Sequence, residues 1–232
     1  AIKLFCDIYR GQKIITLPQN TVVLTELYKA KIASLEECYG TIHTGVKSFK
    51  AIHIALVELA ELFAKSSSIR FEDIYDKVSL RLKDTLNEIL DFLMNEGFVY
   101  TFIKQEDDFS VPETYYSWGM QPAFDYLIAQ KVYKGLNAGE VVEINNTDGI
   151  FQMLALISIE NGKLITEYTN IKIENQEAFE LICYALANCS VDVAGEYSEY
   201  LKKLMGYSVA EFREIFNNVM LPVLKIDKHP LG

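Results

Sequence analysis

The apolar positions between Ile69 and Lys134 change their spacing in an order that predicts helices, then strands, then a helix. The expected elements are, in chain order, helices 71–78 and 80–97, strands 98–103 and 112–118, and helix 121–135. The helices place leucine and isoleucine at intervals of three and four, whereas the strands are rich in β-forming residues. Gly97 ends the longer helix, and Pro122 lies in the first turn of the last one. This order predicts a winged helix with a small β-hairpin wing.

Helical spacing also dominates the segments on either side of this stretch. The pattern predicts helices 1–10, 21–40 and 46–66 before it, and helices 174–189, 193–206 and 208–221 after it. Between them, the apolar residues 151–165 contain an Asn-Gly turn and predict either a helix and a strand or a helix pair. We therefore predict a mainly α protein in three parts. These are a helical lid region at 1–45, a winged-helix domain at 46–135 and an α-helical, repeat-like extension at 136–232.

The composition provides material for a core and gives the chain an acidic character. Half of the 232 residues are apolar and 12% are aromatic, which is far from a disordered composition. The net charge of −10 argues against a nucleic-acid binder, because phosphate contacts need a basic face. No apolar run approaches the roughly 20 residues of a membrane-spanning helix, and no secretory signal pattern is visible. We therefore predict a cytoplasmic protein without a membrane partner.

The charge on the longer predicted helix argues against DNA binding by the winged helix. Domains of this kind commonly read DNA through a helix placed in the major groove. Here residues 82–96 carry four carboxylates against one lysine, so the helix would repel phosphate. The turn after the first strand adds three more carboxylates, Glu106, Asp107 and Asp108. The sequence therefore predicts a winged helix used for structure or protein interaction.

The sequence contains no recognisable catalytic or metal-binding signature. None of the histidines or cysteines has the spacing of metal ligands. These residues are His43, His53, His229, Cys6, Cys38, Cys183 and Cys189. The four thiols are expected to be reduced and mostly buried. No G-x-x-x-x-G-K loop followed by Ser or Thr is present, so the segment cannot cradle a triphosphate in that manner and is predicted not to be an enzyme by itself.

Two groups of residues admit both a functional and a structural interpretation. An aromatic series could form a ligand box, but we favour a packing seam between the strands and the helix that follows them. Its members are Tyr115, Tyr116, Trp118, Phe124, Tyr126 and Tyr133. Adjacent acid pairs are expected on solvated faces and not as a catalytic dyad. These pairs are Glu36-Glu37, Glu72-Asp73 and Asp107-Asp108.

Two stretches resemble segments of one protein family. AIKLFCDIYRG, residues 1–11, resembles the segment after the conserved proline of the nucleotide-binding module in NACHT and related STAND ATPases, where P-L-x-L-K-L-F-C-x-x-Y is common. YYSWGMQPAFDYLIAQKVY, residues 115–133, resembles the end of the winged helix in the same proteins. Its helix pattern, Asp/Glu-Tyr-Leu-x-Ala, is matched from Asp125 to Ala129. The motifs cover residues 1–134, and the remainder is similar only in architecture.

The resemblance implies that a nucleotide-binding domain precedes Ala1 and holds ATP or ADP with Mg²⁺, while this segment holds no cofactor. In that family the winged helix often supplies a histidine that touches the β-phosphate of ADP. By position this residue falls at Met120 or Gln121. Gln121 is therefore the candidate nucleotide-sensing residue, although its amide carries no charge. The chain also begins within a helical pattern, which favours a fragment of a larger protein, with a processed or tagged N-terminus as the alternative.

These observations lead to three hypotheses about function. The first is a non-catalytic regulatory segment of a STAND-type NTPase of the bacterial antiviral or signalling class. It would couple recognition of a protein partner, either a second copy or a foreign protein, to the upstream nucleotide-binding domain. The second is a stand-alone winged-helix protein that binds nucleic acid or a transcription partner. The third, an enzyme with dispersed acidic residues, is supported by no sequence feature.

Overall fold

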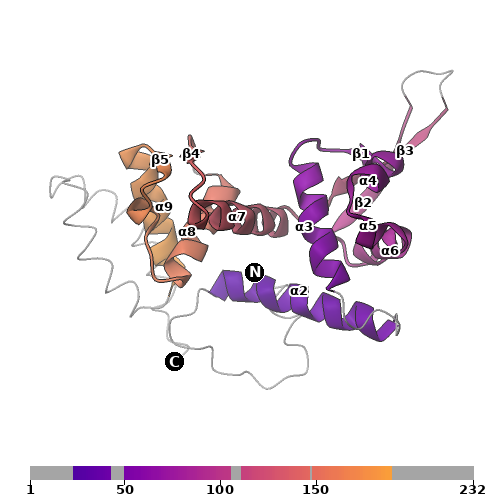
Figure 1. Cartoon of the computed structure of the whole chain (residues 1–232), viewed down its shortest axis with the longest axis horizontal. Coiled ribbons are helices and arrows are strands. Elements are labelled where there is room, and N and C mark those ends of the chain that lie inside the picture. The colour runs from indigo at the N-terminus through magenta and orange to yellow at the C-terminus, as the bar shows by residue number, and fades with distance from the viewer. Residues whose placement is uncertain (1–22, 43–49, 106–110, 147, 190–232) are drawn as a thin grey trace, which may run out of the picture. The chain divides into compact units, whose positions relative to one another are not determined.

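The computed structural model describes residues 23–42, 50–105, 111–146 and 148–189 (Figure 1). Within these ranges the protein is mainly helical, with eight α-helices and two small sheets. The chain divides into two compact units, one spanning Tyr28–Ile128 and the other containing the described residues from Ala129 onward. The division into three parts at residues 45 and 135 stays a prediction.

The first unit combines helices with one antiparallel sheet. Its elements are α2 (Val23–Ile42), α3 (Ala51–Phe63), β1 (Ile69–Arg70), α4 (Phe71–Lys77), α5 (Leu80–Lys83), α6 (Leu86–Asn95), β2 (Val99–Lys104), β3 (Glu113–Trp118) and the N-terminal part of α7 (Gln121–Asn137). The strand order is β1-β3-β2, so β3 lies in the centre of the sheet. Strands β2 and β3 confirm the predicted hairpin, and α7 confirms the predicted helix after it.

Apolar stripes on the helices form the core of this unit. In α3, Ile52, Leu56 and Leu59 are fully buried at the spacing of one helix face. Ile89 and Leu93 of α6 are buried to the same degree. Each side chain of this kind contributes roughly 1.5–3 kcal/mol when it is removed from water. Burial of these faces therefore supplies most of the energy that holds the helices together.

Helix α2 packs on α6 through an aromatic pair and an ion pair. The rings of Tyr39 and Phe92 meet edge-on, with centroids 5.3 Å apart. The ammonium of Lys31 lies 2.9 Å from the carboxylate of Glu96, and both side chains are largely shielded from water. Burial raises the pKa of Tyr39, and the charges of nearby carboxylates raise it further, so the phenol stays protonated.

The predicted helix 80–97 is instead two helices, α5 and α6, separated by a turn at Asp84 and Thr85. The backbone N–H of Thr85 donates to the Leu82 carbonyl, three residues back, over 3.1 Å. This tighter winding redirects the chain while Leu82 and Leu86 both remain buried. Neither aspartate nor threonine prevents a helix, and Leu82 and Leu86, four residues apart, could both be buried by one continuous helix, so the break has no local explanation in the sequence.

Strand β1 was not predicted, because the sequence pattern indicated a break at residues 66–68 followed directly by a helix. The two residues of β1 pair with the distant β3, Ile69 with Tyr116 and Arg70 with Tyr115. Two residues are too few to show an alternation of apolar and polar positions. The element therefore exists only through its pairing with a strand more than forty residues later.

Two glycines allow the backbone before β2 and the backbone after β3 to lie close together at the base of the hairpin. Gly97, before β2, has a φ of +77°, a conformation that other residues rarely adopt. A Cβ atom added to Gly119, after β3, would lie 2.6 Å from the carbonyl oxygen of Gly97. The N–H of Gly119 also donates to the carbonyl of Phe98 over 2.8 Å. Glycine is therefore required at both positions for the strands to enter and leave the sheet side by side.

The described residues of the second unit form helices around a short parallel strand pair. After α7 come β4 (Val142–Ile144), α8 (Gly149–Glu160), the 3₁₀ helix η1 (Ile165–Glu167), β5 (Ile171–Ile173) and α9 (Asn175–Ala187). Strands β4 and β5 run parallel, with Glu143 opposite Lys172, and α8 lies between them in the sequence. The Asp148 carboxylate caps α8 by accepting two backbone N–H groups.

The predicted α-helical extension also contains two short strands in this segment. Helix α9 confirms the predicted helix 174–189, but β4 lies in the expected connector and β5 follows η1. Residues 151–165 supply α8 and the first residue of η1, which matches neither of the two alternatives. Each strand has only three residues, too few for a reliable period-2 signal. The predicted helices 1–10, 193–206 and 208–221 lie outside the described residues.

None of the helices in the described ranges is both long enough and apolar enough to cross a membrane.

Two leucines of α5 provide a matched test of this packing. Leu82 is fully buried, whereas Leu80, on the same short helix, is 83% exposed. We expect Leu82→Ala to lower the free energy of unfolding by about 2–5 kcal/mol, and Leu80→Ala to change it by no more than about 0.5 kcal/mol. Urea titration followed by the fluorescence of Trp118, the only tryptophan, measures both. Equal effects would contradict the burial of Leu82 and the exposure of Leu80.

Candidate functional site

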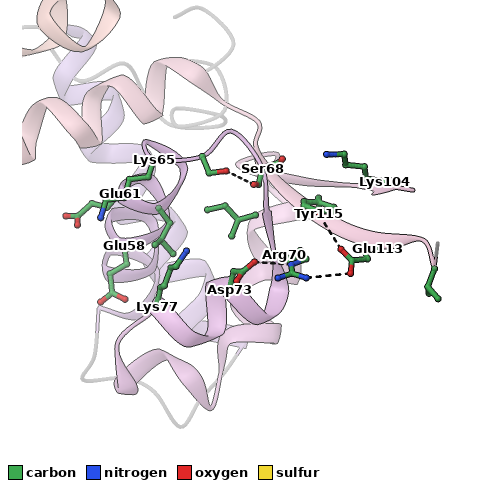
Figure 2. Close-up of a pocket in the computed structure, with 14 residues that line it drawn as sticks. Glu58, Glu61, Lys65, Ser68, Arg70, Asp73, Lys77, Lys104, Glu113 and Tyr115 are labelled. Atoms are coloured by element: carbon green, nitrogen blue, oxygen red, sulfur yellow. Dashed lines mark hydrogen bonds and ion pairs between the residues drawn. The ribbon is translucent and has the colours of Figure 1, made fainter. Parts of the chain in front are cut away.

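An open groove of about 1080 Å³ lies between the helices and the hairpin of the first unit (Figure 2). Its walls come from the end of α3, the segment that leads into β1, helix α4 and the near ends of β2 and β3. The hydroxyl of Ser117 donates to the carbonyl of Ser67 over 2.6 Å and so ties that segment to β3. The groove therefore rests on a fixed sheet edge.

Charged side chains of both signs line the groove in equal number. The basic residues are Lys65, Arg70, Lys77 and Lys104, and the acidic residues are Glu58, Glu61, Asp73 and Glu113. The groove is thus formally neutral in a chain with a net charge of −10. Its electrostatic potential differs from that of an average surface of this acidic protein.

Arg70 holds two of the carboxylates in place. Its Nε donates to Oδ2 of Asp73 over 3.0 Å, and its Nη1 forms an ion pair with Oε1 of Glu113 at 3.6 Å. The hydrogen bond to Asp73 and the charge of that residue raise the pKa of Arg70 above its ordinary value, with a smaller contribution from Glu113. Arg70 directly precedes α4, Asp73 lies in the first turn of that helix, and Glu113 begins β3, so these two contacts of Arg70 join the helix to the hairpin, as Figure 2 shows.

A third carboxylate is also engaged, which leaves two lysines available. The carboxylate of Glu58 accepts the backbone N–H of Ser79, the residue that precedes α5, over 2.8 Å. Lys104 lies over the ring of Tyr115 at 5.6 Å. Lys65 and Lys77 are exposed, and no carboxylate of the described residues forms an ion pair with them. These two ammonium groups are the free positive charges of the groove.

Charged and hydroxyl-bearing side chains make up most of the lining of the groove. Among its lining residues there is neither histidine nor cysteine, so a nucleophile with an adjacent base cannot be identified there. In the part of the chain that the structure describes, no cluster of three histidine, cysteine or acidic side chains could hold a metal ion. What the groove offers is charge, hydrogen-bonding groups and a strand edge.

Gln121, the predicted nucleotide-sensing residue, does not line the groove. It is exposed at the first position of α7, and its amide N–H donates to the carboxylate of Asp125 over 2.8 Å. Met120, the neighbouring candidate, accepts the indole N–H of Trp118 through its carbonyl over 2.7 Å. The structure therefore separates the sequence-predicted position from the groove, and the role of Gln121 stays a prediction.

The aromatic series proves to be several separate contacts. Trp118 meets Phe124 with ring centroids 5.8 Å apart, which confirms the expected seam between β3 and α7 for that pair. Tyr126 stacks on Tyr28 of α2 at 5.4 Å. The remaining members each contact a ring elsewhere: Tyr115 meets Phe102, Tyr116 meets Phe71, and Tyr133 meets Tyr168. The series does not gather into one ligand box.

The histidines and cysteines also take separate places. His53 is half-buried in α3, and its backbone N–H donates to the carboxylate of Glu36 over 2.9 Å. Cys183 is buried, Cys189 is half-buried, and Cys38 is exposed, so the expectation of burial is wrong for Cys38. All three thiols are free. His43, His229 and Cys6 lie outside the described residues, as does the acid pair Asp107-Asp108.

Sequence reasoning missed the groove because its charges are far apart along the chain. In the sequence, Lys65 precedes the segment from α4 to α6 and Lys104 follows it. Only the pairing of β1 with β3 brings together the parts of the chain that carry these two lysines. The one local signal is the spacing of Arg70 and Asp73, which lie three residues apart at the start of a helix. That spacing is common on helices and identifies no site by itself.

Comparison of the chain with protein-family models, with curated proteins and with solved structures finds no match.

The cysteines provide a test of the predicted difference in exposure. Burial raises the pKa of the Cys183 thiol to about 12 and that of Cys189 to about 11. Since only the thiolate reacts, we expect iodoacetamide at pH 8 to label Cys38 at least about tenfold faster than Cys183. Peptide mapping by mass spectrometry separates the sites. In urea the rates should converge, and equal rates in the native protein would contradict the burial of Cys183.

Proposed function

We propose that this chain is a non-catalytic regulatory and interaction segment of a STAND-type NTPase. It couples recognition of a protein partner to an upstream nucleotide-binding domain. In this proposal the Tyr28–Ile128 unit is a winged helix with β2 and β3 as its wing, and α2 belongs to the helical lid. ATP or ADP with Mg²⁺ binds the upstream domain, Gln121 is the sensing residue, and the residues after α7 begin the recognition region.

The order of the elements carries the proposal. A helix, a short strand, further helices and a two-stranded hairpin follow one another from α3 to β3. The returning strand of the hairpin lies between the other two, in the order β1-β3-β2. This combination of chain order and sheet order is the arrangement expected of a winged helix, and it supports the interpretation made from the sequence.

The attachment of α2 supports its role as a lid that moves with the winged helix. Lys31 and Glu96 form a shielded ion pair, and Tyr39 packs on Phe92. Contacts of this kind allow a force on α2 to reach α6 without deformation of the core. A clamp with two conformational states needs a rigid element of this kind. Binding at one end of the clamp can shift the other end only through contacts that differ between the two states.

The surface charge of α6 supports a protein partner over DNA. Helix α6 contains no lysine or arginine, and its exposed face includes Glu88 and Asp91. A helix without basic residues gains nothing from phosphate contacts and adds repulsion. The alternative function, a stand-alone winged helix that binds nucleic acid, therefore lacks the electrostatic footprint on the helix that would enter a groove.

The proposal can be tested in the protein that contains this segment. The coding sequence before Ala1 should contain a phosphate-binding loop within about 150–250 residues, a range set by ordinary domain sizes. In that protein we expect Lys31→Glu to accelerate the release of a fluorescent ADP analogue about fivefold, because it turns the ion pair with Glu96 into a repulsive pair. The double variant Lys31→Glu, Glu96→Lys restores the pair and should restore the rate. Absence of the upstream loop would overturn the proposal.

Nucleic-acid binding separates the proposal from its alternative. We expect the 232-residue chain to give no mobility shift with a 30-base-pair duplex at micromolar concentration in low salt, where non-specific binding is strongest. The matched arm uses a protein variant in which Glu88 and Asp91 are replaced by lysine. A mobility shift that appears only with this variant would agree with repulsion of DNA by the carboxylates of α6. Tight binding by the unmodified chain would favour the nucleic-acid-binding alternative.

A further inference from the structure

We propose that the groove between α3, α4 and the hairpin binds an extended acidic segment of a partner protein, which adds to the free edge of β3. The inference does not rest on the proposed function, since it concerns only the chemistry of the groove. Two independent features carry it, an unpaired stretch of strand edge and two unpaired lysines beside that edge.

The first feature is the part of β3 that β1 leaves uncovered. Strand β1 pairs only with Tyr115 and Tyr116, because the chain turns into α4 directly after Arg70. On that edge Glu113 and Thr114 face no strand of the described residues. Successive residues of an antiparallel strand direct their backbone groups to opposite edges, so one of the two presents both N–H and C=O toward the groove. An exposed edge of this kind is a template for an added strand.

The second feature is the charge beside this edge. Asp73 and Glu113 are held by Arg70, and Glu58 accepts the Ser79 N–H. Lys65 and Lys77 remain exposed and without an ion pair among the described residues, and both line the groove. A segment that carries carboxylates supplies the missing partners. Its charge also selects this neutral groove over the rest of a chain that is negative overall.

The shape and the polarity of the groove favour a polypeptide over other ligands. Sites for small molecules are enclosed and mostly apolar, whereas this groove is open and its lining is rich in charged side chains. Its volume of about 1080 Å³ exceeds what most small ligands fill. Val111, 82% exposed at the groove's far end, offers an apolar contact that a peptide side chain can cover.

The experiment uses the 232-residue chain and a fluorescein-labelled decapeptide of alternating threonine and glutamate, which places every carboxylate on one face of an extended strand. Fluorescence anisotropy at low salt should show saturable binding of this peptide and none of its counterpart with lysine in place of glutamate. We expect the double variant Lys65→Glu, Lys77→Glu to weaken binding about tenfold. The control variant is Lys172→Glu, which reverses the charge of an exposed residue on β5, outside the groove. This variant should leave the affinity unchanged.

A second peptide tests the strand addition itself. N-methylation of the threonine amides keeps every charge but removes the donors that an added strand needs. We expect this peptide to bind about two- to tenfold more weakly than the parent decapeptide, since the hydrogen bond to the one exposed carbonyl of that edge is lost at roughly 0.5–1.5 kcal/mol. Equal binding by the two peptides would overturn the proposal, because charge alone would then account for the affinity.

Two further outcomes would replace the proposed occupant. Tighter binding of a ten-nucleotide oligothymidylate than of the acidic decapeptide would make the groove a nucleic-acid site. A dimer in sedimentation velocity that dissociates in the Lys65→Glu, Lys77→Glu variant would make a second copy the occupant. Trp118 fluorescence and circular dichroism verify that each variant is folded. Peptide binding without an upstream phosphate-binding loop would uphold this inference while overturning the proposed function, so the two can fail separately.

Discussion

The packing of Trp118 is the interaction on which the first unit depends. Its indole meets three phenyl rings edge-on, those of Phe63, Phe98 and Phe124. These rings belong to α3, to the turn before β2 and to α7, so one side chain joins α3, the hairpin and the last helix of the unit. The indole N–H is satisfied by the Met120 carbonyl. A two-stranded hairpin is marginal alone, and this contact is what gives β2 and β3 a fixed orientation.

The sequence predicts those parts of the fold that arise from local patterns. The stripe of Ile52, Leu56 and Leu59 indicates α3, because burial of one face follows directly from the spacing of its apolar residues. The β-forming residues of β2 and β3, with a charged turn between them, indicate the hairpin for the same reason. Within the hairpin, the sequence does not indicate which side chains are buried. In β2 only Val99 is buried, and the apolar Ile103 is 73% exposed.

The parts that the sequence does not predict depend on partners far along the chain. Strand β1 exists through Tyr115 and Tyr116, and β4 exists through β5 on the far side of α8. The break before α6 falls at Asp84 and Thr85, two residues that a continuous helix would also tolerate. The groove has the same origin, because its two free lysines belong to different helices. No window of sequence contains these relations, so neither the small parallel pair nor the candidate site could be derived from periodicity or composition.

The two candidate positions lie at opposite ends of one strand. Strand β3 begins at Glu113, beside the groove, and ends at Trp118, whose indole binds the residue before Gln121. Six residues of strand span roughly 20 Å, and the pairing of β3 with β2 along its whole length resists bending. A partner strand that pairs with Glu113 or Thr114 would therefore act on the same element that positions the start of α7. Gln121 carries no charge and already donates to Asp125. Under the proposed function, coupling between the groove and a bound nucleotide would therefore travel through the packing of Trp118.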